Sequence, residues 1–217
     1  MKKIVVLISG RGSNFVAIEE CALAENWEQN IGAKIVAVIS NRPDAKGLEL
    51  AKGYGIDAVC VDHKAFETRE AFEEKLAEVI SKYEPDLIVL AGFMRILTAG
   101  FVDRFEGKIL NIHPALLPSF KGLDTHQRAI DAGVRMAGTT VHFVTAALDG
   151  GAIIAQAAVP VLPSDDAHRL ADRVLVYEHQ IYALAVKACI TGRVRYEGDR
   201  AVMDDETALG LTLFGQV

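Results

Sequence analysis

Short aliphatic runs alternate with longer segments of helical periodicity through the first 145 residues of this 217-residue chain. Such alternation is typical of a parallel sheet whose strands are joined by covering helices. The runs span 4–8, 35–39, 58–61, 87–90, 109–112 and 140–144. The pattern predicts an α/β fold: a Rossmann-like, open, twisted and mostly parallel sheet with helices on both faces.

Two segments carry the clearest helical spacing. The first is ended by Pro85, and the second follows the turn signals at Pro160 and Pro163. Apolar residues recur in them every three or four positions, as on one face of a helix. The two stripes are Phe72, Leu76, Val79 and Tyr83, and Leu170, Val174, Tyr177, Ile181 and Leu184. We also expect strands at 152–159 and 194–196, whereas the tail 198–217 carries little signal.

Composition excludes several classes of protein. A hydrophobic content of 51% is that of a globular chain with a large core, and the length favours a single domain over 1–217. The formal charge of −6 makes nucleic acid a poor partner. No apolar stretch approaches the roughly 18 residues of a membrane span. Three cysteines without metal spacing predict no disulfide framework and no metal site, and they fit the cytoplasm.

The loop after the first predicted strand is a candidate anion site. It reads Ser-Gly-Arg-Gly-Ser-Asn over 9–14 and opens a helix. Gly12 lets the backbone approach an anion, Ser13 and Asn14 supply polar groups, and the helix amino end adds its dipole. The spacing matches neither the dinucleotide fingerprint nor a P-loop. An ordinary strand-to-helix turn explains the loop equally well.

A histidine and an asparagine end the fifth predicted strand. Asn111 and His113 share one face by the period of two, at the carboxyl edge where open α/β sheets bind ligands. An imidazole and an amide donor together suit stabilisation of an oxyanion. The alternative is a histidine satisfied by backbone groups, and these residues alone favour that alternative.

Two carboxylates extend this candidate site. Asp149 follows the sixth predicted strand and could reach the same edge, where it would hold the His113 ring charged and oriented. An Asp-Gly turn is the alternative. Glu178 has apolar helical neighbours and could receive an amino group, or else escape to solvent or pair with Arg173. His142 is expected to be structural.

Four segments together closely resemble the glycinamide ribonucleotide formyltransferases. They read S-G-R-G-S-N at 9–14, V-L-A-G-F-M-R-I-L at 89–97, N-I-H-P-A-L-L-P at 111–118 and H-F-V-T-A-A-L-D-G-G at 142–151. The resemblance runs from residue 3 to about residue 196. It implies the formyltransferase fold and transfer of a formyl group from 10-formyltetrahydrofolate to glycinamide ribonucleotide, a step of purine synthesis, without a metal.

The resemblance also implies roles for individual residues. Asn111, His113 and Asp149 correspond to the catalytic residues of the family. The ribonucleotide contacts are implied at Gly12, Ser13, Asn14 and Glu178, and the folate contacts at Arg69, Met94, Arg95, Ile96, Leu97, Asn111, Val144, Thr145, Leu148 and Asp149. A phosphate-binding half over about 1–100 would then precede a folate-binding and catalytic half over about 101–197. We expect a monomer or a weak homodimer.

Departures from the family pattern are local. Ala146 and Ala147 stand where an acidic residue is common, Thr140 replaces a frequent serine, and 120–122 replaces an aromatic-Pro-Gly turn. The first three bear on the shape of the folate loop and on water placement.

Three other functions are alternatives to this one. Formyltetrahydrofolate deformylase has an additional amino-terminal domain, and methionyl-tRNA formyltransferase has a carboxyl-terminal tRNA-binding domain. Neither domain is expected here, because the pattern starts at residue 3 and only about twenty residues follow it. A binding module without activity would not need Asn111, His113 and Asp149 together.

Overall fold

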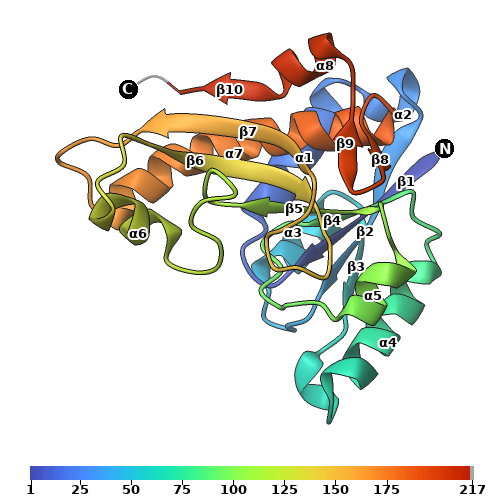
Figure 1. Cartoon of the computed structure of the whole chain (residues 1–217). Helices are drawn as coiled ribbons and strands as arrows, with labels where there is room; N and C mark the ends of the chain where they lie inside the picture. Colours follow the sequence, from blue (N-terminus) through green and yellow to red (C-terminus); the bar gives the residue numbers. More distant parts are fainter. Residues whose placement is uncertain (216–217) are drawn as a thin grey trace. The chain divides into compact units, whose positions relative to one another are not determined.

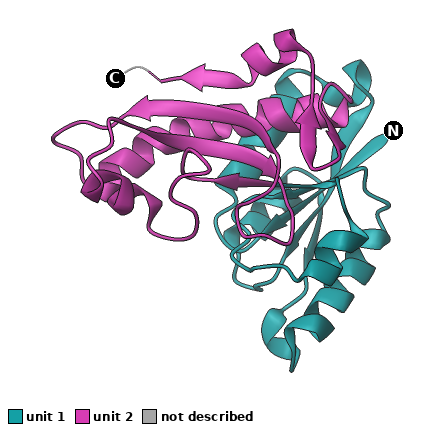
Figure 2. Ribbon diagram, in the orientation of Figure 1, with its two compact units in different colours: residues 1–110 teal, residues 111–217 magenta. Residues whose placement is uncertain are grey.

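The computed structural model describes residues 1–215, which divide into two compact units (Figures 1 and 2). Unit 1 comprises residues 1–110 and unit 2 begins at residue 111. The strand β5 (Ile109–His113) carries the chain from one unit into the next. Each unit contains strands and helices in alternation, which confirms the α/β class.

Unit 1 is built on four parallel strands in the order β4-β1-β2-β3. Residues Ile4 to Ile8 of β1 are completely buried, which explains their unbroken aliphatic run. The elements are β1 (Lys2–Ile8), α1 (Ser13–Ala24), α2 (Trp27–Asn30), β2 (Ala33–Ser40), α3 (Lys46–Gly53), β3 (Asp57–Cys60), the 3₁₀ turn η1 (His63–Ala65), α4 (Arg69–Ser81), β4 (Leu87–Leu90) and α5 (Ala99–Arg104).

The strand order of unit 1 reverses between β1 and β4. The chain proceeds outward from β1 through β2 to β3, and then returns to place β4 on the other side of β1. Right-handed crossovers in opposite directions put their helices on opposite faces, so α1 and α3 cover one face and α4 covers the other. Ligands of open α/β sheets bind at such a reversal, outside the carboxyl ends of the strands.

Unit 2 contains the strand order β10-β7-β6-β5. Strands β6 and β7 pair antiparallel, β10 runs parallel to β7, and α7 packs on β6 and β7. The elements after β5 are α6 (Thr125–Asp131), β6 (Met136–Phe143), β7 (Ile153–Pro160), α7 (Ala167–Ile190), the hairpin β8 (Arg195–Glu197) and β9 (Arg200–Val202), α8 (Asp205–Gly210) and β10 (Thr212–Phe214).

Every strand and both helices expected from the sequence are confirmed, with changes at their ends. The sixth strand begins four residues earlier than predicted, at Met136, and the long helix extends to Ile190. Residues 198–215 contain more regular structure than their composition indicated. Within this segment β10 adds to the sheet edge through backbone hydrogen bonds to β7, an interaction that leaves little trace in side-chain pattern.

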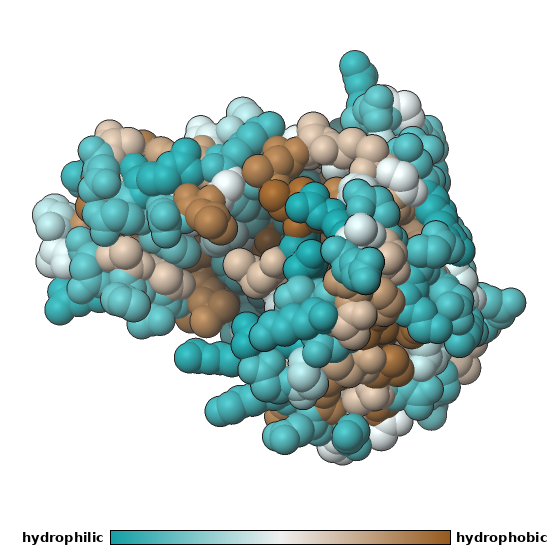
Figure 3. Space-filling model, turned by 90° about the horizontal axis from the view of Figure 1, so that it is seen from below, coloured by the Kyte–Doolittle hydropathy of each residue, from teal (hydrophilic) through white to brown (hydrophobic). Residues whose placement is uncertain are grey.

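No helix in residues 1–215 is both long enough and apolar enough to cross a bilayer. Hydrophilic side chains cover most of the face in Figure 3, where hydrophobic side chains form separate patches.

The carboxyl group of Glu19 lies in the core of unit 1 without an ion pair to any described residue. Glu19 on α1 is only 9% exposed, beside the buried side chains of Phe15, Ile18 and Ala22 on the same helix face. No ion pair in the described part of the chain compensates its charge. Burial raises the pKa of Glu19 from 4.5 to about 7. Ionised Glu19 therefore destabilises unit 1.

Replacement of Glu19 by Gln should stabilise the protein in alkaline solution. Unfolded Glu19 ionises above its ordinary pKa of 4.5, whereas the folded group stays neutral up to about pH 7. The contribution of Glu19 to the free energy of unfolding is therefore complete below pH 4.5 and is lost as the pH rises through 7. In urea unfolding we expect Glu19→Gln to gain about 1–3 kcal/mol at pH 8 and almost nothing at pH 4.

The exposed neighbour supplies the matched control. Glu20→Gln removes the same charge from the adjacent position of α1, where the side chain is exposed. An equal gain from Glu20→Gln at pH 8 would attribute the effect to net charge and contradict the burial explanation.

Candidate active site

A cavity of about 480 Å³ lies at the carboxyl ends of the strands of unit 1. Segments that follow all four strands line it: residues 9–14 after β1, residues 41–42 after β2, residue 63 after β3, and residues 91–95 after β4. The cavity thus occupies the point where the strand order reverses. The predicted anion loop forms one wall of it.

Backbone geometry suits this wall to an anion. Gly12 precedes α1 with φ of 76°, a left-handed conformation that favours glycine. A methyl group on Gly12 would lie 3.1 Å from the Cα of Gly47, so the close approach of these two segments also requires glycine. The first N–H groups of α1 have no carbonyl within the helix to bond, and Gly12 has no side chain to cap them. N–H groups at a helix amino end are suited to binding an anionic group.

Guanidinium groups add positive charge to the cavity. Arg11, Arg42 and Arg95 all line it. Asp44 holds the Arg42 side chain through two hydrogen bonds of 3.1 and 2.8 Å. The Arg95 guanidinium lies 5.2 Å from the centre of the Phe72 ring.

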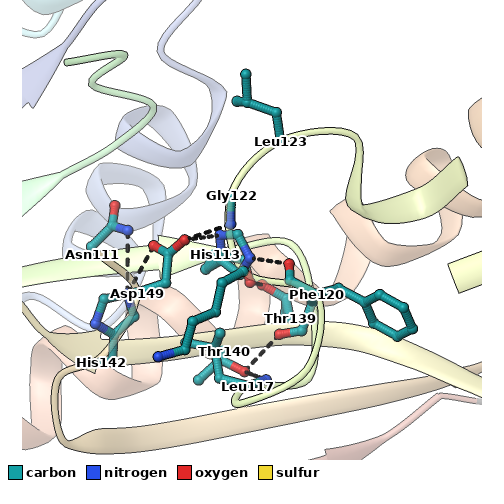
Figure 4. Close-up of polar contacts among 12 residues, drawn as sticks. Asn111, His113, Leu117, Phe120, Gly122, Leu123, Thr139, Thr140, His142 and Asp149 are labelled. Atoms are coloured by element: carbon teal, nitrogen blue, oxygen red, sulfur yellow. Dashed lines mark hydrogen bonds and ion pairs between the residues drawn. The ribbon is translucent and has the colours of Figure 1, made fainter. Parts of the chain in front are cut away.

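In unit 2 the predicted trio of Asn111, His113 and Asp149 comes together, as Figure 4 shows. His113 Nδ1 lies 3.4 Å from Asp149 Oδ2, and both side chains are more than 90% buried. Asp149 adopts φ of 46° in the turn after β6. The backbone N–H of Gly122 donates to Asp149 Oδ2 at 2.9 Å and fixes the carboxylate in place.

Both nitrogens of His113 are engaged. Because a carbonyl oxygen can only accept, the 2.9 Å contact between Nε2 and the Phe120 carbonyl requires a proton on Nε2. Nδ1 faces the Asp149 carboxylate. An imidazole in this setting can carry positive charge, and its Nε2–H points at an oxygen that a substrate oxygen could replace.

His142 orients Asn111. Its Nδ1 donates to the Phe143 carbonyl at 2.9 Å, which leaves Nε2 of the neutral ring to accept from the Asn111 amide at 3.3 Å. Asp149 Oδ1 lies 3.9 Å from the same Nε2. Burial lowers the pKa of His142, and it outweighs the raising effects of the Phe143 carbonyl and Asp149. The neutral ring therefore sets the direction of the amide of Asn111.

Buried hydroxyls support the exit of β5. Thr139 donates to the His113 carbonyl at 3.0 Å. Thr140 donates to the Ala115 carbonyl at 2.7 Å and accepts from the Leu117 N–H and the Gln156 amide, both at 3.0 Å. The serine-to-threonine departure therefore keeps a fully bonded hydroxyl that holds the segment after His113.

The turn that carries Asp149 depends on a glycine. A methyl group on Gly151 would lie 1.7 Å from the Phe143 carbonyl oxygen, so a side chain there would displace the turn. The Asp-Gly-Gly sequence thus forms a turn, and this turn places the Asp149 carboxylate beside His113.

The other predicted contact residues lie in several settings. Met94, Ile96 and Leu148 are exposed and Leu97 is buried. Arg69 is exposed at the first position of α4, and Val144 and Thr145 are half-buried after β6. Glu178 is half-buried on α7.

The sequence left Arg173 open as a partner of Glu178, but its guanidinium is engaged elsewhere. It makes two 2.7 Å bonds to Asp165 and donates to the Pro160 carbonyl at 2.9 Å.

Sequence reasoning missed the part played by His142 and the buried residues Ser9 and Asn41 of the cavity. The period of two places His142 on the same face of β6 as Thr140, which was a usable signal. Its partner Asn111 on β5 could not be identified without the strand pairing. Within residues 1–215, no group of three or more His, Cys, Asp or Glu is arranged to hold a metal ion.

His142 should make stability depend on pH. The pKa of His142 is lowered in the folded protein. Its contribution to the free energy of unfolding is therefore complete above pH 6.5, its ordinary pKa, and is lost as the pH falls below 6.5. The loss is at most about 1.4 kcal/mol per pH unit. His142→Gln cannot take up a proton and should lose less stability between pH 7.5 and 5.5 in urea unfolding. If the exposed-site variant His168→Gln flattens the profile as much, the burial explanation is wrong.

Comparison with known proteins relates this geometry to a reaction class. A family model described as formyl transferase matches residues 2–186. The phosphoribosylglycinamide formyltransferase of Haemophilus influenzae is 46% identical over 204 residues, and that of Escherichia coli K12 is 44% identical over 203 residues. Each alignment covers 94% of this chain and 94% of the relative.

Solved structures agree with the sequence relatives. The crystal structure of glycinamide ribonucleotide transformylase 1 from Symbiobacterium toebii has a TM-score of 0.87 and 45% identity, and covers 94% of this chain and 95% of its own. The fold, the family model and the relatives lead to one conclusion: this chain belongs to the formyl transferase family.

Proposed function

We propose that the protein transfers the formyl group of 10-formyltetrahydrofolate to the amino group of glycinamide ribonucleotide. The products are formylglycinamide ribonucleotide and tetrahydrofolate, within purine synthesis. The observation that carries the proposal is the buried Asp149–His113 contact with Asn111 beside it, in a chain whose 44–46% identical relatives are named for this reaction.

The chemistry is assigned to unit 2. The neutral amine of the ribonucleotide attacks the formyl carbon, and the carbonyl oxygen gains negative charge. The Nε2–H of His113 and an N–H of Asn111 donate to that oxygen. One amide proton of Asn111 is directed at His142, which leaves the second for the oxyanion.

The hydrogen bond to the Phe120 carbonyl indicates where the Nε2–H of His113 points. The carbonyl accepts from Nε2 at 2.9 Å, the separation that an oxyanion would adopt. In the reaction, the substrate oxygen replaces this carbonyl. The segment 119–123 must shift for the exchange to occur.

Asp149 has two tasks in this scheme. Its carboxylate, 3.4 Å from Nδ1, stabilises positive charge on His113 as the oxyanion forms. It also accepts the proton that the attacking amine loses, through water, for delivery to the departing folate nitrogen. When the tetrahedral intermediate collapses, the bond between carbon and folate nitrogen breaks and the formamide remains.

The phosphate of the ribonucleotide is assigned to unit 1. The loop with Gly12, Ser13 and Asn14 supplies backbone donors, and the guanidinium groups of the cavity supply charge. Binding both substrates in a fixed geometry can account for about 7–11 kcal/mol of the barrier.

The remaining contacts follow the family pattern. Glu178 is proposed to receive the substrate amine. The folate contacts are proposed at Arg69, at Met94, Arg95, Ile96 and Leu97, and at Val144, Thr145 and Leu148 along with Asn111 and Asp149. We place the enzyme in the cytoplasm as a monomer or weak homodimer. The three cysteines are free thiols, which is in keeping with a reducing compartment.

Turnover with and without the acceptor tests the proposal. Purified protein is mixed with 10-formyltetrahydrofolate, and release of tetrahydrofolate is followed spectroscopically. We expect release only when glycinamide ribonucleotide is present. Equal release without it would make water the acceptor and the protein a deformylase. No release in either case would contradict formyl transfer from this donor.

Asp149→Asn separates the catalytic assignment from binding. Asparagine keeps the size and the oxygen that accepts from Gly122, but it cannot stabilise charge on His113 or take a proton. We expect turnover to fall by at least 100-fold, while ribonucleotide affinity by calorimetry changes less than threefold. Parallel losses in affinity and turnover would contradict this role for Asp149.

A further inference from the structure

A buried hydrogen-bond chain crosses the carboxyl ends of the strands of unit 1. It contains Ser9 after β1, Asn41 after β2, His63 after β3 and the Met94 backbone after β4. These four residues also line the cavity. Ser9 is 5% and Asn41 3% exposed, so their polar atoms depend on protein partners.

Ser9 joins the exits of β1 and β4. Its backbone N–H donates to the Gly92 carbonyl at 3.2 Å, and its hydroxyl oxygen accepts from the Met94 N–H at 2.8 Å. The hydroxyl has a single proton, which it donates to Asn41 Oδ1 at 2.6 Å. Two segments from opposite sides of the strand-order reversal are therefore connected through one side chain.

Asn41 extends the chain towards β3. Because its Oδ1 accepts from Ser9, its amide nitrogen faces His63 Nδ1 at 3.2 Å. His63 Nδ1 lies closer, at 2.8 Å, to the Asn41 carbonyl, which can only accept, so Nδ1 carries the ring proton. Among the described residues, His63 Nε2 has no hydrogen-bond partner.

We infer that Ser9 and Asn41 are positioning residues, which align the anion loop that begins beside Ser9 with the segment that carries Met94. The inference rests on the proposed function for the identity of the ligands: the loop is assigned to the ribonucleotide phosphate and the Met94 segment to the folate. Loss of the Ser9 hydroxyl would remove the partner of the Met94 N–H and leave the buried Asn41 Oδ1 without one. Both loops would then lose their relative placement.

Binding of ribose 5-phosphate to the full-length protein tests the inference without requiring turnover. We expect Ser9→Ala and Asn41→Ala each to weaken binding at least fivefold. The double variant should bind no more than twofold more weakly than the single variant of lower affinity, because Ser9→Ala and Asn41→Ala each break the same Ser9–Asn41 hydrogen bond. Ser9→Ala should also raise the KM for 10-formyltetrahydrofolate at least threefold, although Ser9 belongs to the phosphate side.

A core variant controls for lost stability. Ile80→Val removes one methylene from a fully buried side chain of α4 outside the cavity. It should lower the Tm and leave ribose 5-phosphate affinity within twofold of wild type. Equal weakening by Ile80→Val, or unchanged binding in both Ser9→Ala and Asn41→Ala, would overturn the inference.

If the variants fail to fold, amide hydrogen exchange of the wild-type protein, measured with and without ribose 5-phosphate, tests the positioning role instead. Ribose 5-phosphate should slow exchange at the Met94 and His63 N–H groups as well as in the anion loop. Protection confined to residues 12–14 would overturn the positioning role, as would absence of binding. A protein that binds ribose 5-phosphate with this pattern but does not turn over glycinamide ribonucleotide would contradict the proposed function alone.

Discussion

The contact between Asp149 and His113 is the interaction on which the rest of the proposed catalytic arrangement depends. A carboxylate buried beside an imidazole is stable only if both groups have further hydrogen-bond partners. The Gly122 N–H donates to Asp149 Oδ2, and His113 Nε2–H donates to the Phe120 carbonyl. The backbone around the pair is shaped accordingly, since Asp149 itself lies in the left-handed region and Gly151 admits no side chain. The strand ends of unit 2 thus hold charge in a defined place.

The same physical rule organises unit 1. Parallel strands present their carboxyl ends together, and the polar groups there must be bonded to one another or to a ligand. In unit 1 the hydrogen bonds of Ser9 and Asn41 join polar groups to one another, whereas the N–H groups of the anion loop are left for a ligand. The reversal of strand order beside β1 explains why the cavity forms there rather than at the outer strand.

Much of this fold was predictable because burial on both faces makes a strand a continuous aliphatic run. The helix α4 was predictable for another reason: its apolar residues repeat with helical spacing, and this stripe located the helix within three residues at each end. β10 was not predictable, since its pairing with β7 uses backbone groups in a short segment with no strong pattern. For the site, the resemblance led to Asn111, His113 and Asp149, and the structure brings these together.

Hydrogen-bond partners that meet only through strand pairing could not be predicted from the sequence. His142 looked like an ordinary strand residue because nothing in its neighbourhood along the chain refers to Asn111. Ser9 and Asn41 are 32 residues apart, and their hydrogen bond follows from the pairing of β1 with β2. Hydrogen bonds to backbone atoms, such as that from His113 to Phe120, leave no residue-type signature at all.

The central claim is that the formyl carbon moves to an amine and not to water. The most direct measurement uses 10-formyltetrahydrofolate labelled with ¹³C in the formyl group, and follows the label by NMR in the presence of glycinamide ribonucleotide. We expect one new formamide resonance whose carbon is coupled to the nitrogen of a ¹⁵N-labelled acceptor. Label that appears as free formate instead would contradict the claim.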